Sequence, residues 1–258
     1  LTQALLPLLL KSDAGSLVVA GQFSLDALQK GWYVGCALIG SIIGVASAGI
    51  ISDRFGRKKA MLFSAFMFSL SAIGCAVCNG FTQLVVYRII GGVGIGVVSI
   101  VSPMYISEVA MAQRRGTLVS LYQLAITMGF LFAYLINWLI LGVAENAATD
   151  PSCRLASDFS NKLFVDEYWR GMLGSETIPA LLFFFIIFLI PESPRWLIVR
   201  GRGAEATAVL QRIYVTADEA ERQKAVTEES ISGEAKSEWK ALLSPGIMKA
   251  VLIGSAIA

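Results

Sequence analysis

The sequence contains no histidine among its 258 residues, and it is poor in charge and in cysteine. The absence of histidine excludes Ser–His–Asp triads, histidine-ligated metals and histidine-ligated haem. Of the four cysteines, Cys75 and Cys78 lie close together in an apolar segment without a second ligand pair, so we interpret them as small apolar residues. A net charge of +2 indicates no basic surface for nucleic acid. We therefore expect no enzyme, no metal and no cofactor.

Apolar residues make up 55% of the chain, and they gather in long runs without a charge. Such a run crosses the hydrocarbon core as a helix once it reaches about 18 residues. The uncharged runs occupy residues 31–52, 60–87, 89–107 and 116–144. We therefore predict an all-α polytopic membrane protein in a lipid bilayer, with spans near 1–23, 31–52, 59–78, 81–101, 116–141 and 173–190, and a last apolar stretch at 246–258.

Basic residues are concentrated in alternate connections between these spans. They lie in the 53–59 loop, at Arg114 and Arg115, and after the sixth span at Arg195, Arg200 and Arg202. Residues 142–172, on the opposite side, carry five acidic and three basic residues. Because basic loops stay on the cytoplasmic side, we expect the amino terminus and the connection after the sixth span to be cytoplasmic.

Residues 199–242 have a different composition, with charged residues at helical spacing. One interpretation is a solvated linker. The other is a group of short cytoplasmic helices that cap the bundle, because Val209, Leu210, Ile213 and Tyr214 supply an apolar stripe.

Glycines recur in two of the predicted spans. In the second span they stand at 31, 35, 40, 44 and 49, close to one helical face. Small residues at this spacing let two membrane helices approach closely. The glycines at 92, 94 and 96 receive the same interpretation, because no soluble strand precedes them as a dinucleotide site would require.

Three charged residues lie within or at the ends of predicted spans: Asp13, Arg88 and Glu108. A charge in a membrane span is costly and therefore suggests a function. An Asp and an Arg on neighbouring spans suit proton coupling, because the arginine stays charged while the carboxylate can accept a proton. The alternative is a static ion pair that fixes helix packing.

The 49–59 loop combines glycine and charge in a specific order, Gly-xxx-Asp-Arg-x-Gly-Arg. Gly49 and Gly56 would permit close packing and a tight turn. Asp53 could face the amino terminus of a neighbouring helix, where the dipole favours an anion. A loop that only sets topology would explain the charges but not this order.

These motifs resemble the sugar porter family of the major facilitator superfamily, with bacterial xylose–proton symporters as the nearest likeness. Besides the 49–59 loop, the resemblance rests on Tyr87-Arg88-Ile-Ile-Gly-Gly, Pro103-Met-Tyr-Ile-Ser-Glu108, Arg115-Gly116, Gln123 with Ile126, Trp169-Arg170 and Pro191-Glu-Ser-Pro-Arg195-Trp196.

The resemblance implies twelve helices in two six-helix halves, with a cytoplasmic helical domain between them. On this basis residues 1–198 form the amino-terminal bundle, 199–243 the cytoplasmic helical linker, and 244–258 the start of helix seven. The carboxy-terminal half would be missing, together with most of the sugar contacts, so we expect these 258 residues alone not to transport.

The resemblance also assigns roles to residues. Asp13 and Arg88 would carry out proton coupling, and Gln123 and Ile126 would contact the sugar. Glu176 matches an acidic residue near the outer end of helix six, without an assigned role. The signature loop and cytoplasmic gate would consist of Gly49, Asp53, Arg54, Gly56, Arg57, Glu108, Arg115, Glu192 and Arg195.

The expected function is transport of a pentose or hexose by alternating access, as proton-coupled symport in the plasma (bacterial inner) membrane. The partners would be the sugar, the proton and the protein's own carboxy-terminal half. Three alternatives remain. One is a facilitative uniporter, and another is a truncated inactive half, since the chain starts at Leu1 and ends abruptly. The third is a sugar sensor, for which the 199–242 stretch is short.

Overall fold

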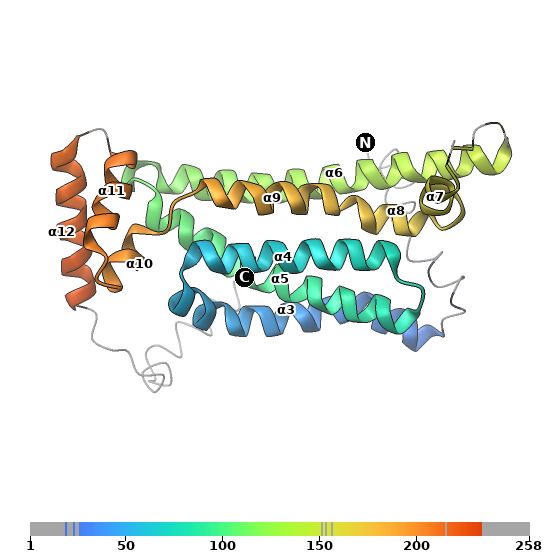
Figure 1. Ribbon diagram of the computed structural model, residues 1–258, viewed down its shortest axis with the longest axis horizontal. Coiled ribbons are helices and arrows are strands. Elements are labelled where there is room, and N and C mark those ends of the chain that lie inside the picture. The colour runs from blue at the N-terminus through green and yellow to red at the C-terminus, as the bar shows by residue number, and fades with distance from the viewer. Residues whose placement is uncertain are drawn as a thin grey trace. The chain divides into compact units, whose positions relative to one another are not determined.

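The computed structural model describes residues 19, 23, 26–150, 152, 154–155, 157–214 and 216–233. The chain divides into two compact units, residues 1–196 and 197–258, which are described separately below. All the regular secondary structure of the described residues is helical (Figure 1).

The first unit contains five long apolar helical stretches within the described residues, each long enough to cross a membrane. Their composition explains them, because the bilayer core offers backbone groups no hydrogen bonds and a helix satisfies them internally. This confirms the predicted polytopic all-α class. The helices are α3 (Ala27–Phe55), α4 (Arg57–Val77), α5 (Phe81–Val109), α6 (Arg115–Thr149) and α8 (Tyr168–Ser175) with α9 (Thr177–Leu189).

The first predicted span lies outside the described residues except for Val19 and Phe23. Short elements complete the first unit. They are the 3₁₀ turn η1 (Ala112–Arg114), α7 (Asp158–Asn161) and the π-helical η3 (Lys162–Asp166).

Helix α3 packs against α5 through glycines on both helices. A Cβ at Gly40 or Gly44 would collide with a backbone carbonyl of α5, and a Cβ at Gly92 or Gly96 would collide with one of α3. Close packing is therefore confirmed at these positions. At the other three glycines of the predicted α3 face, 31, 35 and 49, a Cβ would meet nothing within 4 Å, so close packing is not found there.

Two buried clusters lie at opposite ends of α3, α4 and α5. The first, at the α4–α5 turn, includes Tyr33, Leu84 and Trp169. The second, at the α3–α4 turn, includes Met61, Val101 and Ile187. Between them the helices are fixed in register, which sets the positions of the charged residues at each end.

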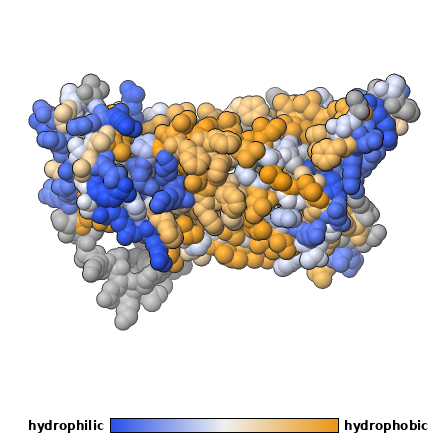
Figure 2. Space-filling model, in the orientation of Figure 1, coloured by the Kyte–Doolittle hydropathy of each residue, from blue (hydrophilic) through white to orange (hydrophobic). Residues whose placement is uncertain are grey.

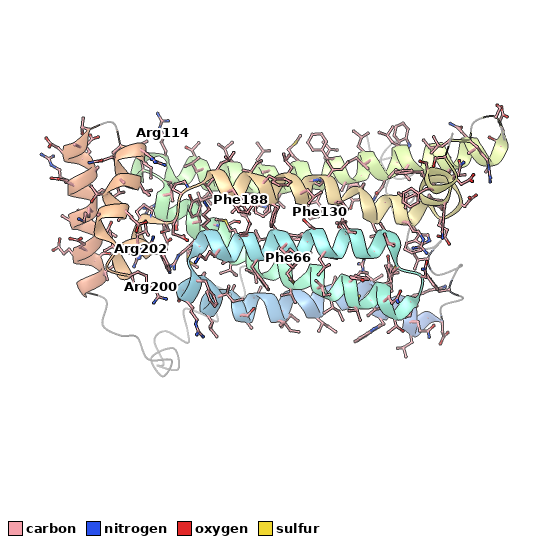
Figure 3. All side chains as sticks on the ribbon, viewed as in Figure 1. Phe66, Arg114, Phe130, Phe188, Arg200 and Arg202 are labelled. Atoms are coloured by element: carbon pink, nitrogen blue, oxygen red, sulfur yellow. The ribbon has the colours of Figure 1, made fainter. Side chains whose placement is uncertain are left out.

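The face of the bundle seen in Figure 2 is largely apolar between its two hydrophilic ends. Phe66 on α4, Phe130 on α6 and Phe188 on α9 are each more than half exposed (Figure 3). Exposed apolar side chains in this number suit contact with lipid or with further helices.

The second unit contains α11 (Gly203–Ile213) and α12 (Ala217–Gly233); α10 (Pro194–Val199) spans the boundary between the units. Of the predicted apolar stripe, Val209 and Leu210 are buried, and Ala206 and Ala220 are buried with them. Residues 203–213 and 217–233 are helical, as the second interpretation expects, while their cytoplasmic location stays a prediction. The predicted start of helix seven lies outside the described residues.

Candidate functional site

A buried ion pair joins α4 to the end of α5. The Arg57 guanidinium donates to both oxygens of the Glu108 carboxylate, with Nε–Oε2 and Nη2–Oε1 distances of 3.0 Å. The two side chains are only 10% and 8% exposed. Nη1 of Arg57 also donates to Asp53 Oδ1 at 3.2 Å and to the carbonyl of Ser52 at 3.3 Å. Such two-point geometry is what a planar guanidinium allows.

The segment after α9 makes further hydrogen bonds to Glu108 and to the start of α4. The Ser193 hydroxyl donates to Glu108 Oε2 at 2.6 Å, and the Ser193 side chain is fully buried. The neighbouring Glu192 carboxylate accepts from the backbone N–H of Lys58 at 3.0 Å, at the amino terminus of α4. We use the term ionic cluster for these residues: Asp53, Arg57, Glu108, Glu192 and Ser193.

Gly56 connects α3 to α4 with a φ of +100°, a conformation that favours glycine. A Cβ there would overlap the Glu192 carboxylate. Glu192 accepts the α4 amide, and Asp53, in the carboxyl-terminal turn of α3, pairs with Arg57. The expected position of Asp53 at the amino terminus of a neighbouring helix stays a prediction.

Three further hydrogen bonds connect residues 188–196 to the same end of the bundle. Trp196 Nε1 donates to the carbonyl of Asp53 at 3.0 Å, and the Tyr105 hydroxyl donates to the carbonyl of Pro191 at 3.0 Å. Lys58 Nζ donates to the carbonyl of Phe188 at 2.9 Å. The loop after α9 is therefore held against the end of the bundle that contains the ionic cluster.

The remaining predicted gate residues lie around this cluster. Arg54 is exposed, with its guanidinium 5.6 Å from the Phe55 ring centroid, and Arg195 is half-buried. Arg115 is exposed at the start of α6. Gly49 is exposed on α3, with open space where a Cβ would stand.

At the other end of the bundle, Arg88 of α5 lies against Tyr33 of α3. The guanidinium carbon is 4.5 Å from the centroid of the Tyr33 ring, which is cation–π geometry. Nε of Arg88 is buried and has no hydrogen-bond partner among the described residues. Asp13, its predicted partner, lies outside the described residues, so this pairing stays a prediction.

Arg88 lines a cavity of about 120 Å³ between α3, α4, α5 and the junction of α8 and α9. We call it the Arg88 cavity; its polar lining consists of Ser71, Cys75, Arg88 and Glu176. Sequence reasoning assigned no role to Glu176 and did not single out Tyr33. Nothing in the sequence pattern distinguishes Tyr33 from other aromatic residues of apolar spans.

The predicted sugar-contacting residues lie on a different helix. Gln123 and Ile126 are exposed on α6, and the Thr127 hydroxyl donates to the Gln123 carbonyl at 3.1 Å. Neither residue lines the Arg88 cavity. The structure therefore brings Arg57 and Glu108 together, but it does not bring Gln123 to Arg88.

Arg170 forms a second buried cluster near the α4–α5 turn. Its guanidinium pairs with Glu167, donates to the carbonyls of Ala76 and Cys78 at the carboxyl end of α4, and lies 4.5 Å from the Trp169 ring centroid. Burial raises the pKa of the Cys78 thiol, which keeps it protonated at neutral pH. The described residues contain no group of three acidic or cysteine side chains that could hold a metal ion.

Comparison with known proteins gives a family match over nearly the whole chain. Residues 10–258 match the family described as "Sugar (and other) transporter". An arabinose–proton symporter of Bacillus subtilis is 36% identical over 236 residues, covering 92% of this chain and 47% of that protein. A D-xylose–proton symporter of Escherichia coli is 40% identical over 201 residues, covering 71% of this chain and 38% of its own length.

Other matches agree. A glucose transport protein of Synechocystis is 42% identical over 191 residues, covering 74% of this chain and 39% of that protein. Among solved structures, the proton:xylose symporter XylE bound to 6-bromo-6-deoxy-D-glucose gives a TM-score of 0.76 at 33% identity, covering 90% of this chain and 51% of that one. The chain thus spans about half the length, or less, of the relatives it matches.

Proposed function

Because this chain belongs to the sugar transporter family, a family of transporters with the major facilitator fold, we propose that the complete protein carries a pentose or hexose across a membrane together with a proton. Two relatives, named as arabinose–proton and D-xylose–proton symporters, support the coupling and the substrate class. Transport would proceed by alternating access, in which one half rocks against the other around the sugar.

The observation that carries the proposal is Arg88, a guanidinium in an apolar span whose buried Nε lacks a hydrogen-bond partner among the described residues. A charge at such depth is retained for function more often than for stability. Asp13, outside the described residues, is its proposed carboxylate partner. Protonation of Asp13 would break the pair and release the helices to move, while Arg88 stays charged.

The ionic cluster is the proposed cytoplasmic gate. Its buried Arg57–Glu108 pair connects α4 with α5, and Ser193 and Glu192 connect both to the loop after α9. We propose that the cluster forms when that side is closed and separates when it opens. The proposed roles of Arg54, Arg115 and Arg195, which lie around it, are to contact the partner half.

Orientation and sugar binding complete the proposal. The amino terminus and the helical segment 199–243 would be cytoplasmic, in a plasma membrane. Gln123 and Ile126 on α6 would contact the sugar, because an amide can donate to one hydroxyl and accept from another. Their exposure on α6 is compatible with a site shared with a carboxy-terminal half.

The test uses the full-length gene product in right-side-out vesicles, with labelled xylose, arabinose and glucose. Wild-type protein should accumulate one of these sugars above its external concentration when the outside is acidic. Asp13→Asn should abolish this accumulation and spare counterflow exchange, because a neutral side chain cannot carry the proton. Unchanged accumulation in Asp13→Asn would exclude Asp13 from coupling.

A facilitative uniporter is the second candidate, since the name of one relative, a glucose transport protein, states no coupling to a proton. The same assay separates the two functions. A uniporter would equilibrate the sugar without accumulating it, at any pH gradient, and Asp13→Asn would then leave uptake unchanged.

A further inference from the structure

Tyr33 contacts Arg88 directly, and its ring has a fixed position. Only 6% of Tyr33 is exposed, and it packs with Leu84 and Trp169 in the cluster at the α4–α5 turn. Helix α3 is itself held at close range to α5 by the packing of Gly40 and Gly44. The ring is therefore preorganised under the guanidinium and does not need to move to reach it.

The buried Nε of Arg88 has no hydrogen-bond acceptor among the described residues. Other ionisable side chains near it are Cys75 from α4 and Glu176 from the α8–α9 junction, both in the Arg88 cavity, with Cys36 on α3 one helical turn from Tyr33. Glu176 interacts with Arg88 electrostatically, yet no described acceptor reaches the buried Nε. A cavity of about 120 Å³ has room for water molecules, which can hydrate the guanidinium.

We propose that Tyr33 is a positioning residue for Arg88. The Tyr33 ring binds the guanidinium while the proton-carrying carboxylate is protonated, and it competes with that carboxylate for the guanidinium when the carboxylate is ionised. The proposal rests on the proposed function, because it gives Arg88 of the coupling pair a second partner, the Tyr33 ring, besides the carboxylate. Without the ring, Arg88 would pair more tightly with the ionised carboxylate. The carboxylate would then be harder to protonate.

The contact is tested first by a double-mutant cycle on melting temperature, with full-length protein in detergent. The four proteins are wild type, Tyr33→Leu, Arg88→Met and the double variant. Tyr33→Leu should lower the melting temperature by about 1 °C or more beyond its effect in the Arg88→Met background, where the cation–π contact is already lost. Equal effects in both backgrounds would overturn the proposal.

Trp32→Leu is the matched control for this cycle. Trp32 is the preceding aromatic residue of α3, but it is half exposed and lines a separate pocket with Ala27, Leu28, Gln29 and Gly31. Its effect on melting temperature should be the same with and without Arg88→Met. Tyr33→Phe keeps the ring and should reproduce the wild-type coupling.

The consequence for coupling is tested by the pH profile of sugar accumulation. Tyr33→Leu should move the half-maximal pH of uptake toward acid by about half a unit or more, since the competing contact is lost. Tyr33→Phe and Trp32→Leu should leave the profile in place. A merely structural residue would change the amount of active protein without moving the profile.

Failure of this proposal and failure of proton coupling are distinguishable. If wild-type protein equilibrates sugar without accumulating it, coupling fails, and the melting-temperature cycle still decides whether the ring binds Arg88. If accumulation is present and the Tyr33→Leu profile coincides with the wild-type profile, the competition is excluded, whatever the cycle shows.

Discussion

The two arginines at opposite ends of the bundle, Arg57 and Arg88, have opposite surroundings. Arg57 makes a buried two-point pair with Glu108 and further bonds to Asp53 and a backbone carbonyl. Arg88 has an aromatic ring on one face, a small cavity beside it and an Nε with no hydrogen-bond partner among the described residues. In this conformation the first arginine donates hydrogen bonds through all three of its nitrogens, whereas the buried Nε of the second donates to no described residue.

This difference matches the two proposed tasks. A gate must be stable when closed, and a fully hydrogen-bonded ion pair shielded from water supplies that stability. A coupling residue must bind and release a carboxylate in every cycle, so strong permanent contacts would slow it. The comparison predicts that both arginines are needed for transport, but that Arg57 contributes more than Arg88 to the stability of the folded protein.

The largest expected effect follows from breaking the Arg57 pair. In Arg57→Met, the Glu108 carboxylate stays buried without its counter-charge, which should cost about 3–5 kcal/mol in the free energy of unfolding. A strong fall in the melting temperature of the full-length protein would show it. Arg202→Met is the control, because it breaks the half-exposed Arg202–Glu205 pair and should cost under about 1 kcal/mol. Similar small shifts in both variants would contradict the assigned strength of the pair.

The second prediction is that alanine substitution has opposite effects on stability at two glycines of the signature loop. Gly56→Ala places a side chain at a φ of +100° and against the Glu192 carboxylate, which should cost about 1–3 kcal/mol. Gly49→Ala adds a methyl group in open space on a helix and should stabilise the protein by about 0.5–1 kcal/mol. Melting temperatures that shift in opposite directions are the expected result. A fall of the same size in both would mean that Gly49 is also tightly packed.

The family resemblance grouped Arg57 and Glu108 in the signature loop and cytoplasmic gate, and the structure shows these two residues as a buried ion pair. Their role as a gate stays a prediction. The role of Ser193 could not be predicted from the sequence, because it depends on the path of the chain after Pro191, which brings the hydroxyl to Glu108. Glu192 at the amino terminus of α4 depends on the same path.

Helix ends show a different kind of limit. The predicted fourth span ends at 101, yet α5 continues through Pro103 to Val109, and α6 continues from the predicted end at 141 to Thr149. Proline removes one hydrogen bond from a membrane helix without ending it when neighbouring groups compensate. The length of an apolar run indicates which part of a helix crosses the hydrocarbon core. It does not indicate where the helix ends, because the helix can extend beyond the core. The Tyr33 contact was missed because an aromatic residue in an apolar helix carries no polar signal.

The smallest expected stability effect is at Arg88, and it is the sharpest test of the comparison. Arg88→Met removes a costly charge from an apolar span and forfeits a cation–π contact worth about 0.5–2 kcal/mol, while Glu176 and the proposed partner Asp13 can each bind a proton and become neutral, so the contributions offset one another. The melting temperature should stay close to that of wild type while proton-driven accumulation disappears. Arg57→Met should both lower the melting temperature and abolish proton-driven accumulation. If Arg88→Met instead unfolds as readily as Arg57→Met, then Arg88 has a strong permanent partner, and the two ends of the bundle are built alike.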